Sequence, residues 1–114
     1  MKLFNRKKRE DSPAFRRDMA KKINGMSVKY VTERRGGGGE AGDDSVIGRS
    51  GALIVRDGEL LVYSSSDVVF RAEVDGLSMS PLLSGEGIIL EGDDTEHGGA
   101  HRKIIAYYTY YLKS

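Results

Sequence analysis

The chain contains no cysteine, and this absence excludes several kinds of site. There can be no disulfide framework, no Cys-ligated zinc or iron–sulfur centre and no thiol nucleophile. Only two histidines are present, His97 and His101, and no serine stands in a nucleophile-elbow context. Because no catalytic motif emerges, we predict that the protein is not an enzyme and that it binds no cofactor.

Long apolar runs are also absent. None approaches the roughly 20 residues that a membrane-spanning helix needs. The first ten residues contain no apolar stretch, so they do not match a secretory signal, and Lys2 stands where myristoylation requires glycine. Charged residues make up 31% of the chain and hydrophobic residues 39%, which is typical of a globular domain. We expect a cytoplasmic location.

The charge that is present is divided between the two ends of the chain. Residues 1–35 hold twelve Lys/Arg and four Asp/Glu, a net +8, whereas residues 36–114 hold six and thirteen, a net −7. We interpret residues 1–11 as a disordered basic arm. Such an arm can be a solvated tail, can bind an anionic partner, or can dock on the acidic body of its own chain. Nucleic acid is disfavoured because few aromatic residues accompany the cations and no nucleic-acid-binding motif is present.

One amphipathic helix is predicted over residues 12–25. Ser12-Pro13 is a good start for a helix, and Gly25 suits the position just past its end. Its apolar stripe is narrow and consists of Phe15, Met19 and Ile23.

Basic residues cover the rest of this helix, so attachment to an anionic membrane surface is the alternative function. The residues expected to make that contact come from the arm and the helix: Lys2, Arg6, Lys7, Lys8, Arg9, Arg16, Arg17, Lys21 and Lys22.

Residues 26–114 are predicted to form an antiparallel β-domain, a small barrel or sandwich, which makes the fold class mainly β (α+β). Asp57-Gly58 between two apolar runs indicates a type I′ hairpin. In the first strand, alternation places Met26, Val28 and Tyr30 on one face. About seven short strands are expected: Met26–Glu33, Gly51–Val55, Glu59–Tyr63, Val68–Val74, Leu77–Met79, Gly87–Glu91 and Lys103–Leu112.

Two polar stretches interrupt this pattern. Residues 35–45 are rich in glycine and are predicted to be a flexible loop, because acidic residues follow the glycines where a phosphate-binding loop would need Gly-Lys-Ser/Thr. The stretch from Gly92 to His101 carries several oxygen and nitrogen ligands, and a metal-dependent enzyme using them is a second alternative. Its spacing does not match a calcium loop, so a solvated hairpin loop is favoured.

Four tyrosines crowd the last predicted strand. In an extended strand Tyr108 and Tyr110 share one face, whereas Tyr107 and Tyr111 share the other. One face must be inside, so the opposite face shows tyrosines to solvent, to a partner or to the docked helix. Tyrosine is enriched at protein interfaces. Packing within the fold is the simpler interpretation, and a protein interface at these residues is the hypothesis to test.

The β-body resembles the small bacterial pleckstrin-homology-like (PH-like) domains. The hairpin GALIVRDGELLVYSS and the following VVFRAEVDGLSMSPLLSGEGIILEG carry the resemblance. It implies a binding scaffold without assigning a ligand. The C-terminal helix of such domains has no counterpart after the last strand, and the 12–25 helix can serve instead. The basic motif of phosphoinositide-binding members is not reproduced. We therefore predict a non-enzymatic interaction module that binds a protein partner; the sequence does not predict its oligomeric state.

Overall fold

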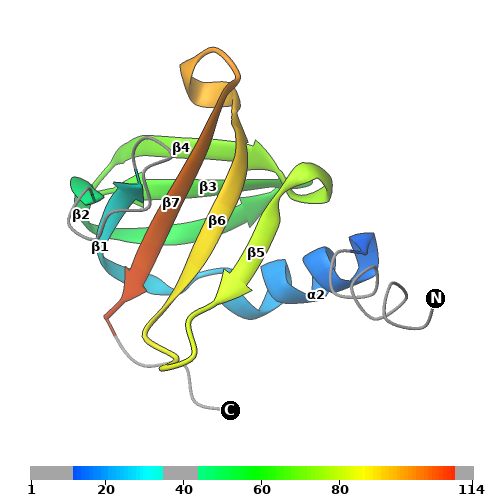
Figure 1. The fold of residues 1–114 in the computed structure, drawn as a ribbon, viewed down its shortest axis with the longest axis horizontal. Helices are drawn as coiled ribbons and strands as arrows, with labels where there is room; N and C mark the ends of the chain where they lie inside the picture. The colour runs from blue at the N-terminus through cyan, green and yellow to red at the C-terminus, as the bar shows by residue number, and fades with distance from the viewer. Residues whose placement is uncertain (1–11, 35–43, 110–114) are drawn as a thin grey trace.

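The computed structural model describes residues 12–34 and 44–109, and Figure 1 shows them as one helix lying against one strongly curved sheet. The predicted arm, most of the Gly-rich loop, Tyr110 and Tyr111 lie outside the described residues. The elements in chain order are helix α2 (Pro13–Ile23), strands β1 (Ser27–Arg34), β2 (Asp44–Arg56), β3 (Glu59–Ser64) and β4 (Asp67–Glu73), the 3-10 turn η1 (Val74–Gly76), β5 (Ser78–Pro81), β6 (Gly87–Asp94), the 3-10 turn η2 (Thr95–His97) and β7 (Ala100–Tyr108).

All seven strands join one antiparallel sheet in the order β4-β3-β2-β1-β7-β6-β5. The sheet folds over so that β4 contacts β6 and η2, which are far from it in the strand order (Figure 1). No hydrogen-bonded ladder joins β4 to β5, so the sheet is not closed into a barrel. The prediction of a small, mainly antiparallel domain of about seven strands with one N-terminal helix is confirmed, in its sandwich form.

The core lies between the two halves of the folded sheet and the helix. Apolar residues from every strand meet there, and the largest fully buried side chains include Phe70, Tyr108, Leu53, Ile88 and Ile104. Burial of each such side chain contributes roughly 1.5–3 kcal/mol to stability. This burial explains why a chain with so few strong helix or turn signals in its second half still folds.

Helix α2 begins and ends as its sequence predicts. The Ser12 hydroxyl accepts a hydrogen bond from the Phe15 amide at 3.2 Å, and Pro13 occupies the first helical position. At the other end the Asn24 side-chain oxygen accepts from the Val55 amide at 2.8 Å, which ties the helix to β2. The helix contacts η1, β2 and β5 through its apolar stripe, in which Met19 and Ile23 are buried.

The hairpin prediction at Asp57-Gly58 is confirmed in detail. Both residues have positive φ, 54° and 77°, as a type I′ turn requires. The turn joins β2 and β3, which pair from Arg56–Glu59 back to Gly51–Ser64.

The hairpin loop predicted within residues 92–101 is present between β6 and β7, but its turn is shorter than predicted and Asp94 is buried instead of solvated. Strands β6 and β7 stay paired as far as Asp94–Ala100, and only η2 and two glycines form the turn. The pairing continues because the polar side chains at this end have partners inside the fold, as described below. Strand β2 likewise begins earlier than predicted, at Asp44.

Candidate protein-binding face of the sheet

The face of the sheet opposite the core carries an unusual concentration of aromatic and aliphatic side chains. Along β7, Ala106 and Tyr108 point into the core, so Tyr107 between them points outward. Tyr107 pairs with Tyr30 of β1 in the sheet register. The two rings lie 4.7 Å apart between centroids with an interplanar angle of 35°, and both side chains are half-buried. An aromatic pair therefore lies on the outer face at the centre of the sheet.

A second row, apolar except for Thr32, runs beside this pair across four neighbouring strands. The register places Ile89 opposite Ile105, Ile105 opposite Thr32, and Thr32 opposite Val46. Ile105 is 5% exposed and does not belong to the core cluster, whereas Val46 is 48% exposed. We define the outer patch as the four accessible residues Tyr30, Tyr107, Ile89 and Val46, which surround the buried Ile105. Outer faces of antiparallel sheets are usually polar, so these apolar residues make this face the candidate contact surface of the sheet.

Tyr30 reaches this face through an irregularity in β1. The sequence pattern placed it with Val28 on one face, and that prediction is wrong. The register shifts between Val28 and Tyr30, so that Val28 and Val31 both enter the core while Tyr30 turns outward.

Tyr108, which the sequence also placed in the expected interface, is a core residue. It is 1% exposed, and its hydroxyl has no hydrogen-bond partner among the described residues. Burial raises the pKa of this phenol to about 12. Tyr108 therefore stabilises the fold and is not available to a partner, while the alternation that separates it from Tyr107 is as predicted.

Tyr108→Phe is expected to raise the free energy of unfolding by about 1 kcal/mol, because it removes a buried hydroxyl that lacks a partner. Urea denaturation of the two proteins measures the difference. A loss of stability on this substitution would show that the hydroxyl does form a hydrogen bond in the folded protein.

The free edge of β4 is closed by side chains from the β6–β7 turn. The Arg71 amide donates to Asp94 Oδ1 at 3.1 Å, and the Thr95 hydroxyl donates to the Arg71 carbonyl at 3.4 Å. Arg102 Nη1 donates to the Val69 carbonyl at 3.2 Å. These bonds occupy backbone groups that an added strand would need.

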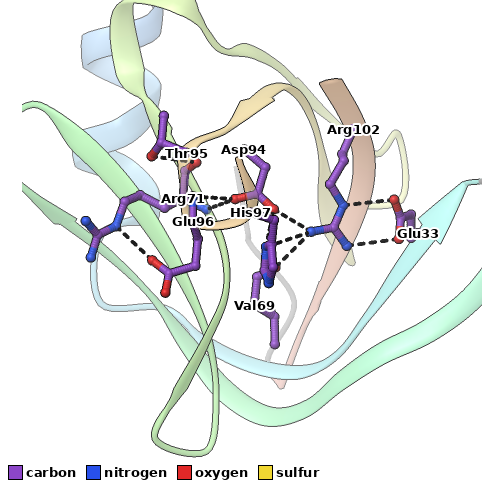
Figure 2. A network of polar contacts seen from close by, with 8 residues as sticks. All are labelled: Glu33, Val69, Arg71, Asp94, Thr95, Glu96, His97 and Arg102. Carbon is purple, nitrogen blue, oxygen red and sulfur yellow. Dashed lines mark hydrogen bonds and ion pairs between the residues drawn. The ribbon is translucent and has the colours of Figure 1, made fainter. Parts of the chain in front are cut away.

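Asp94 is the centre of this network, although it is 0% exposed. Figure 2 shows its carboxylate between the ring of His97 and the guanidinium of Arg102, with Glu33 on the other side of that guanidinium. His97 Nδ1 donates to Asp94 Oδ2 at 2.6 Å, Arg102 Nη1 donates to the same oxygen, and the Glu96 amide donates to Oδ1 at 3.0 Å. Arg102 also makes two 2.9 Å hydrogen bonds to the Glu33 carboxylate. The Arg102 side chain thus binds both Asp94 and Glu33, and His97 joins them through Asp94. Such an arrangement is typical of an ion network that stabilises a fold.

At the other edge of the sheet, strand β5 contains Pro81, which makes it a poor partner for an added strand. The Leu82 amide donates to the Gly87 carbonyl at 2.9 Å. Because every second residue of an antiparallel strand bonds to the same neighbour, the backbone groups of Met79 and Pro81 in β5 point away from β6. Pro81 has no N–H to donate, so the outward edge of β5 offers little to an incoming strand. Both edges of the sheet are therefore poorly suited to strand addition.

The basic residues of α2 do not act as one surface. Arg16 and Arg17 both bind Asp75 of η1: Arg17 through two 3.2 Å bonds to its carboxylate and Arg16 through a 2.7 Å bond to its carbonyl. The Arg17 guanidinium lowers the pKa of the Asp75 carboxyl. Lys21 and Lys22 remain exposed. Met19 and Ile23 of the helix stripe are buried and Phe15 is half-buried, so the side of the helix that faces outward is mainly polar. The arm residues expected to join them, Lys2, Arg6, Lys7, Lys8 and Arg9, lie outside the described residues.

Of the potential metal ligands in the Gly92–His101 stretch, Asp93 and His101 lie on the outer face of β6 and β7, next to Glu91. His101 Nδ1 lies 3.0 Å from Asp93 Oδ1, and its Nε2 lies 3.1 Å from Glu91 Oε2. Hydrogen bonds to Asp93 and Glu91 raise the pKa of His101. In residues 12–34 and 44–109, no group of three His, Asp or Glu side chains is arranged to hold a metal ion. No helix in the same residues is long and apolar enough to cross a membrane.

Comparisons with known proteins find no matching family model, no matching curated protein and no matching solved structure. The resemblance to PH-like domains stays a prediction.

Proposed function

We propose that this chain is a non-enzymatic interaction module that binds a protein partner on the outer patch. The observation that carries the proposal is the Tyr30–Tyr107 pair, which lies half-buried beside an apolar row on the side of the sheet away from the core. Tyrosine combines a large apolar ring with a hydrogen-bonding tip, and it is among the commonest residues in the energetic centres of interfaces.

The surroundings of the patch support the same proposal. Because the β4 edge is occupied by Asp94, Thr95 and Arg102, and because Pro81 blunts β5, strand addition is disfavoured as the mode of binding. A partner that packs on the face needs no free edge. It would cover Ile89 and Val46 at the sides of the tyrosine pair, and their burial would add to the contact energy.

Tyr107→Ala is expected to weaken capture of the partner about tenfold or more, as is usual for a central interface tyrosine. The same change removes one half of an aromatic pair, so the free energy of unfolding should fall by only about 1 kcal/mol. The measurement is affinity capture from the native cell with wild type and variant at equal concentration, alongside urea denaturation of both proteins.

Photo-crosslinking identifies the contact directly. A benzophenone amino acid placed at position 107 should give a defined crosslinked protein, whereas the same group at Asp67, an exposed residue at the start of β4, should not. Equal crosslinking from both positions, or unchanged capture by Tyr107→Ala, would contradict binding at the outer patch.

Attachment to an anionic surface stays the alternative, and it now depends on the arm together with Lys21 and Lys22. Co-sedimentation with anionic liposomes at low and high salt tests it. Loss of binding on removal of residues 1–11 would support the alternative, and binding that survives this removal would eliminate the arm as the anchor.

A further inference from the structure

The end of the outer patch at which the two tyrosines lie is bordered by cations. Arg49 of β2 is opposite Tyr30 in the sheet register, and opposite residues of an antiparallel pair share a face with Cβ atoms about 4.5–5.5 Å apart. Lys29 is the extra residue of the bulge in β1 and directly precedes Tyr30. Both cations are exposed. Arg49, Tyr30 and Tyr107 therefore form one row across β2, β1 and β7, with Lys29 beside it.

The charges of these two cations are not neutralised by the fold. Arg17, Arg71 and Arg102 each pair with a carboxylate. Within residues 12–34 and 44–109, in contrast, no ion pair or side-chain hydrogen bond engages the Lys29 ammonium or the Arg49 guanidinium. Both groups can therefore bind an anionic group of a partner without breaking an existing contact.

The acids of the outer face lie away from the tyrosine row. Glu91 and Asp93 of β6 both bind His101. Gly87 is the residue of β6 opposite Tyr107, so Glu91 is four residues further along the strand, or about 13 Å away. That distance exceeds the roughly 8 Å over which exposed charges act at physiological ionic strength. At the far end of β1 and β2, Asp44 pairs with Arg34 in the register.

Two other acids near this end of the sheet belong to its core side. The Tyr108 amide donates to the Glu86 carbonyl at 2.8 Å, so Glu86 is opposite Tyr108, whose side chain is in the core. Asp67 is opposite Ser64, and alternation from the buried Val62 places both on the core side. The tyrosine end of the outer face is therefore basic, although the β-domain as a whole is acidic.

We propose that the outer patch binds an acidic segment of the partner protein, in which one aromatic side chain packs on Tyr30 and Tyr107 and neighbouring carboxylates bind Arg49 and Lys29. This inference rests on the proposed function and adds to it the chemistry of the partner. The tyrosines are half-buried and Val46 is 48% exposed, so they still offer apolar surface to an added ring. The Arg49 guanidinium can bind a carboxylate through two parallel hydrogen bonds. Charge complementarity of this kind excludes basic partners.

The direct test uses the full chain labelled with ¹⁵N and the capped pentapeptide Glu-Glu-Phe-Glu-Glu, followed through amide chemical shifts. We expect saturable shifts at the amides of Tyr30, Arg49 and Tyr107, with a Kd of about 1 mM. Alanine in place of phenylalanine should weaken binding about tenfold, because less apolar area is buried. Serine in place of the four glutamates should weaken it about fivefold, because each exposed charge pair contributes little. A Lys-Lys-Phe-Lys-Lys peptide should leave these amides unchanged.

Arg49→Glu is expected to weaken binding of the acidic peptide about fivefold or more, through reversal of the charge next to Tyr30. Arg56→Glu is the matched control. Arg56 is also exposed, and it lies in the same strand seven residues further on, about 23 Å from Arg49. Its charge reversal should change binding by less than about twofold. Both variants alter exposed side chains, so the dispersion of their amide spectra should match that of the wild type.

Capture of the native partner separates this inference from the proposed function. Tyr107→Ala tests whether the partner binds at the outer patch, and the two arginine variants test whether that partner is acidic. Weaker capture by Tyr107→Ala with equal capture by Arg49→Glu and Arg56→Glu would leave the outer patch as the binding site and contradict an acidic partner. Unchanged capture by Tyr107→Ala would contradict the proposed function itself.

Three results of the peptide experiment would overturn the proposal. One is the absence of saturable shifts at Tyr30, Arg49 and Tyr107 up to about 5 mM acidic peptide. Another is an equal loss of binding in Arg49→Glu and Arg56→Glu, because the peptide would then respond only to the overall charge of the protein. The third is tighter binding of hexathymidylate than of the peptide at the same amides, which would assign the site to stacked bases and phosphates.

Discussion

Asp94→Ala is expected to lower the free energy of unfolding by about 3–5 kcal/mol, which is the usual cost of removing one partner from a buried ion pair. The carboxylate accepts hydrogen bonds from two backbone amides, from His97 and from Arg102, and its loss leaves the Arg102 guanidinium, whose side chain is only 16% exposed, without one of its anionic partners. Its loss also frees the β4 edge at Arg71. Urea denaturation monitored by circular dichroism measures the change.

The pH dependence of stability supplies a second readout for Asp94. Burial by itself raises the pKa of this carboxyl, but hydrogen bonds from His97, Arg102 and the amides of Arg71 and Glu96 outweigh burial and hold the pKa below its usual range. A carboxyl with a lowered folded-state pKa stabilises the fold above its unfolded pKa of about 3.9, and this contribution is lost as the pH falls through the folded pKa. In Asp94→Asn, the acid-induced fall in stability below about pH 4 should therefore be shallower than in wild type.

Asp93 is the matched control because it precedes Asp94 in β6 and points to the opposite, exposed face. Its carboxylate contacts the exposed His101, and exposed pairs contribute about 0–1 kcal/mol. Asp93→Ala should accordingly change stability by less than about 1 kcal/mol. A loss of similar size from both substitutions would show that the burial of Asp94 is not what makes it important.

Local sequence signals predicted the elements whose structure depends on neighbouring residues. The type I′ turn needs two residues that tolerate positive φ, and Asp57-Gly58 supplies them. The start of α2 needs a cap and a preorganised first residue, and Ser12-Pro13 supplies both. In both cases the deciding interactions lie within four residues.

The polar network around Asp94 could not be predicted in this way, because its members are far apart in the chain. Glu33 and Arg102 are 69 residues apart in the chain, and the Arg71 amide is 23 residues from Asp94. Gly92–Gly99 reads as a solvated turn because its composition is polar, and no local pattern reveals that Asp94 will be covered by β4. Only the folding-over of the sheet brings these partners together, which is why the strand ends were predicted too short.

The candidate site was partly predictable for a related reason. Strict alternation in the last strand separates Tyr107 from Tyr108, and the structure keeps that separation. The outward orientation of Tyr30 was not predicted, because the alternation of side chains is interrupted at a bulge and nothing in the sequence around Val28 indicates one. The pairing of Tyr30 with Tyr107 then follows from a register that sequence alone does not supply.

The helix arginines show how the charge division of the sequence is used. Arg17 and Asp75 are 58 residues apart, and they join the basic end of the chain to its acidic body. This contact adds to the packing of Met19 and Ile23 in holding α2 against the body, whereas the exposed Lys21 and Lys22 do not take part in it. The basic residues that the sequence places together on α2 thus have two roles in the structure: Arg16 and Arg17 bind Asp75, whereas Lys21 and Lys22 face solvent.

Gly51→Ala is expected to destabilise the fold by about 3 kcal/mol, near the upper end of what overpacking costs. An added Cβ at Gly51 would lie 1.6 Å from the Tyr63 carbonyl oxygen, and this oxygen belongs to the backbone of the paired strand β3. Because a backbone atom cannot move aside as a flexible side chain can, β2 and β3 would have to separate next to the buried Leu53 and Val62. Urea denaturation measures the loss, and hydrogen exchange should show it first in β3.

The control for Gly51 is Gly76, which lies in η1 and has no atom within 4 Å of the position that a Cβ would occupy. Its φ is not in the positive range, so alanine can adopt the same backbone conformation. Gly76→Ala should leave stability unchanged or raise it by up to about 1 kcal/mol, because alanine restricts the unfolded chain more than glycine does. If Gly51→Ala were as harmless as Gly76→Ala, β2 and β3 could not lie as close together at Gly51 as they do in the structure. The pairing register that directs Leu53 into the core would then have to be different.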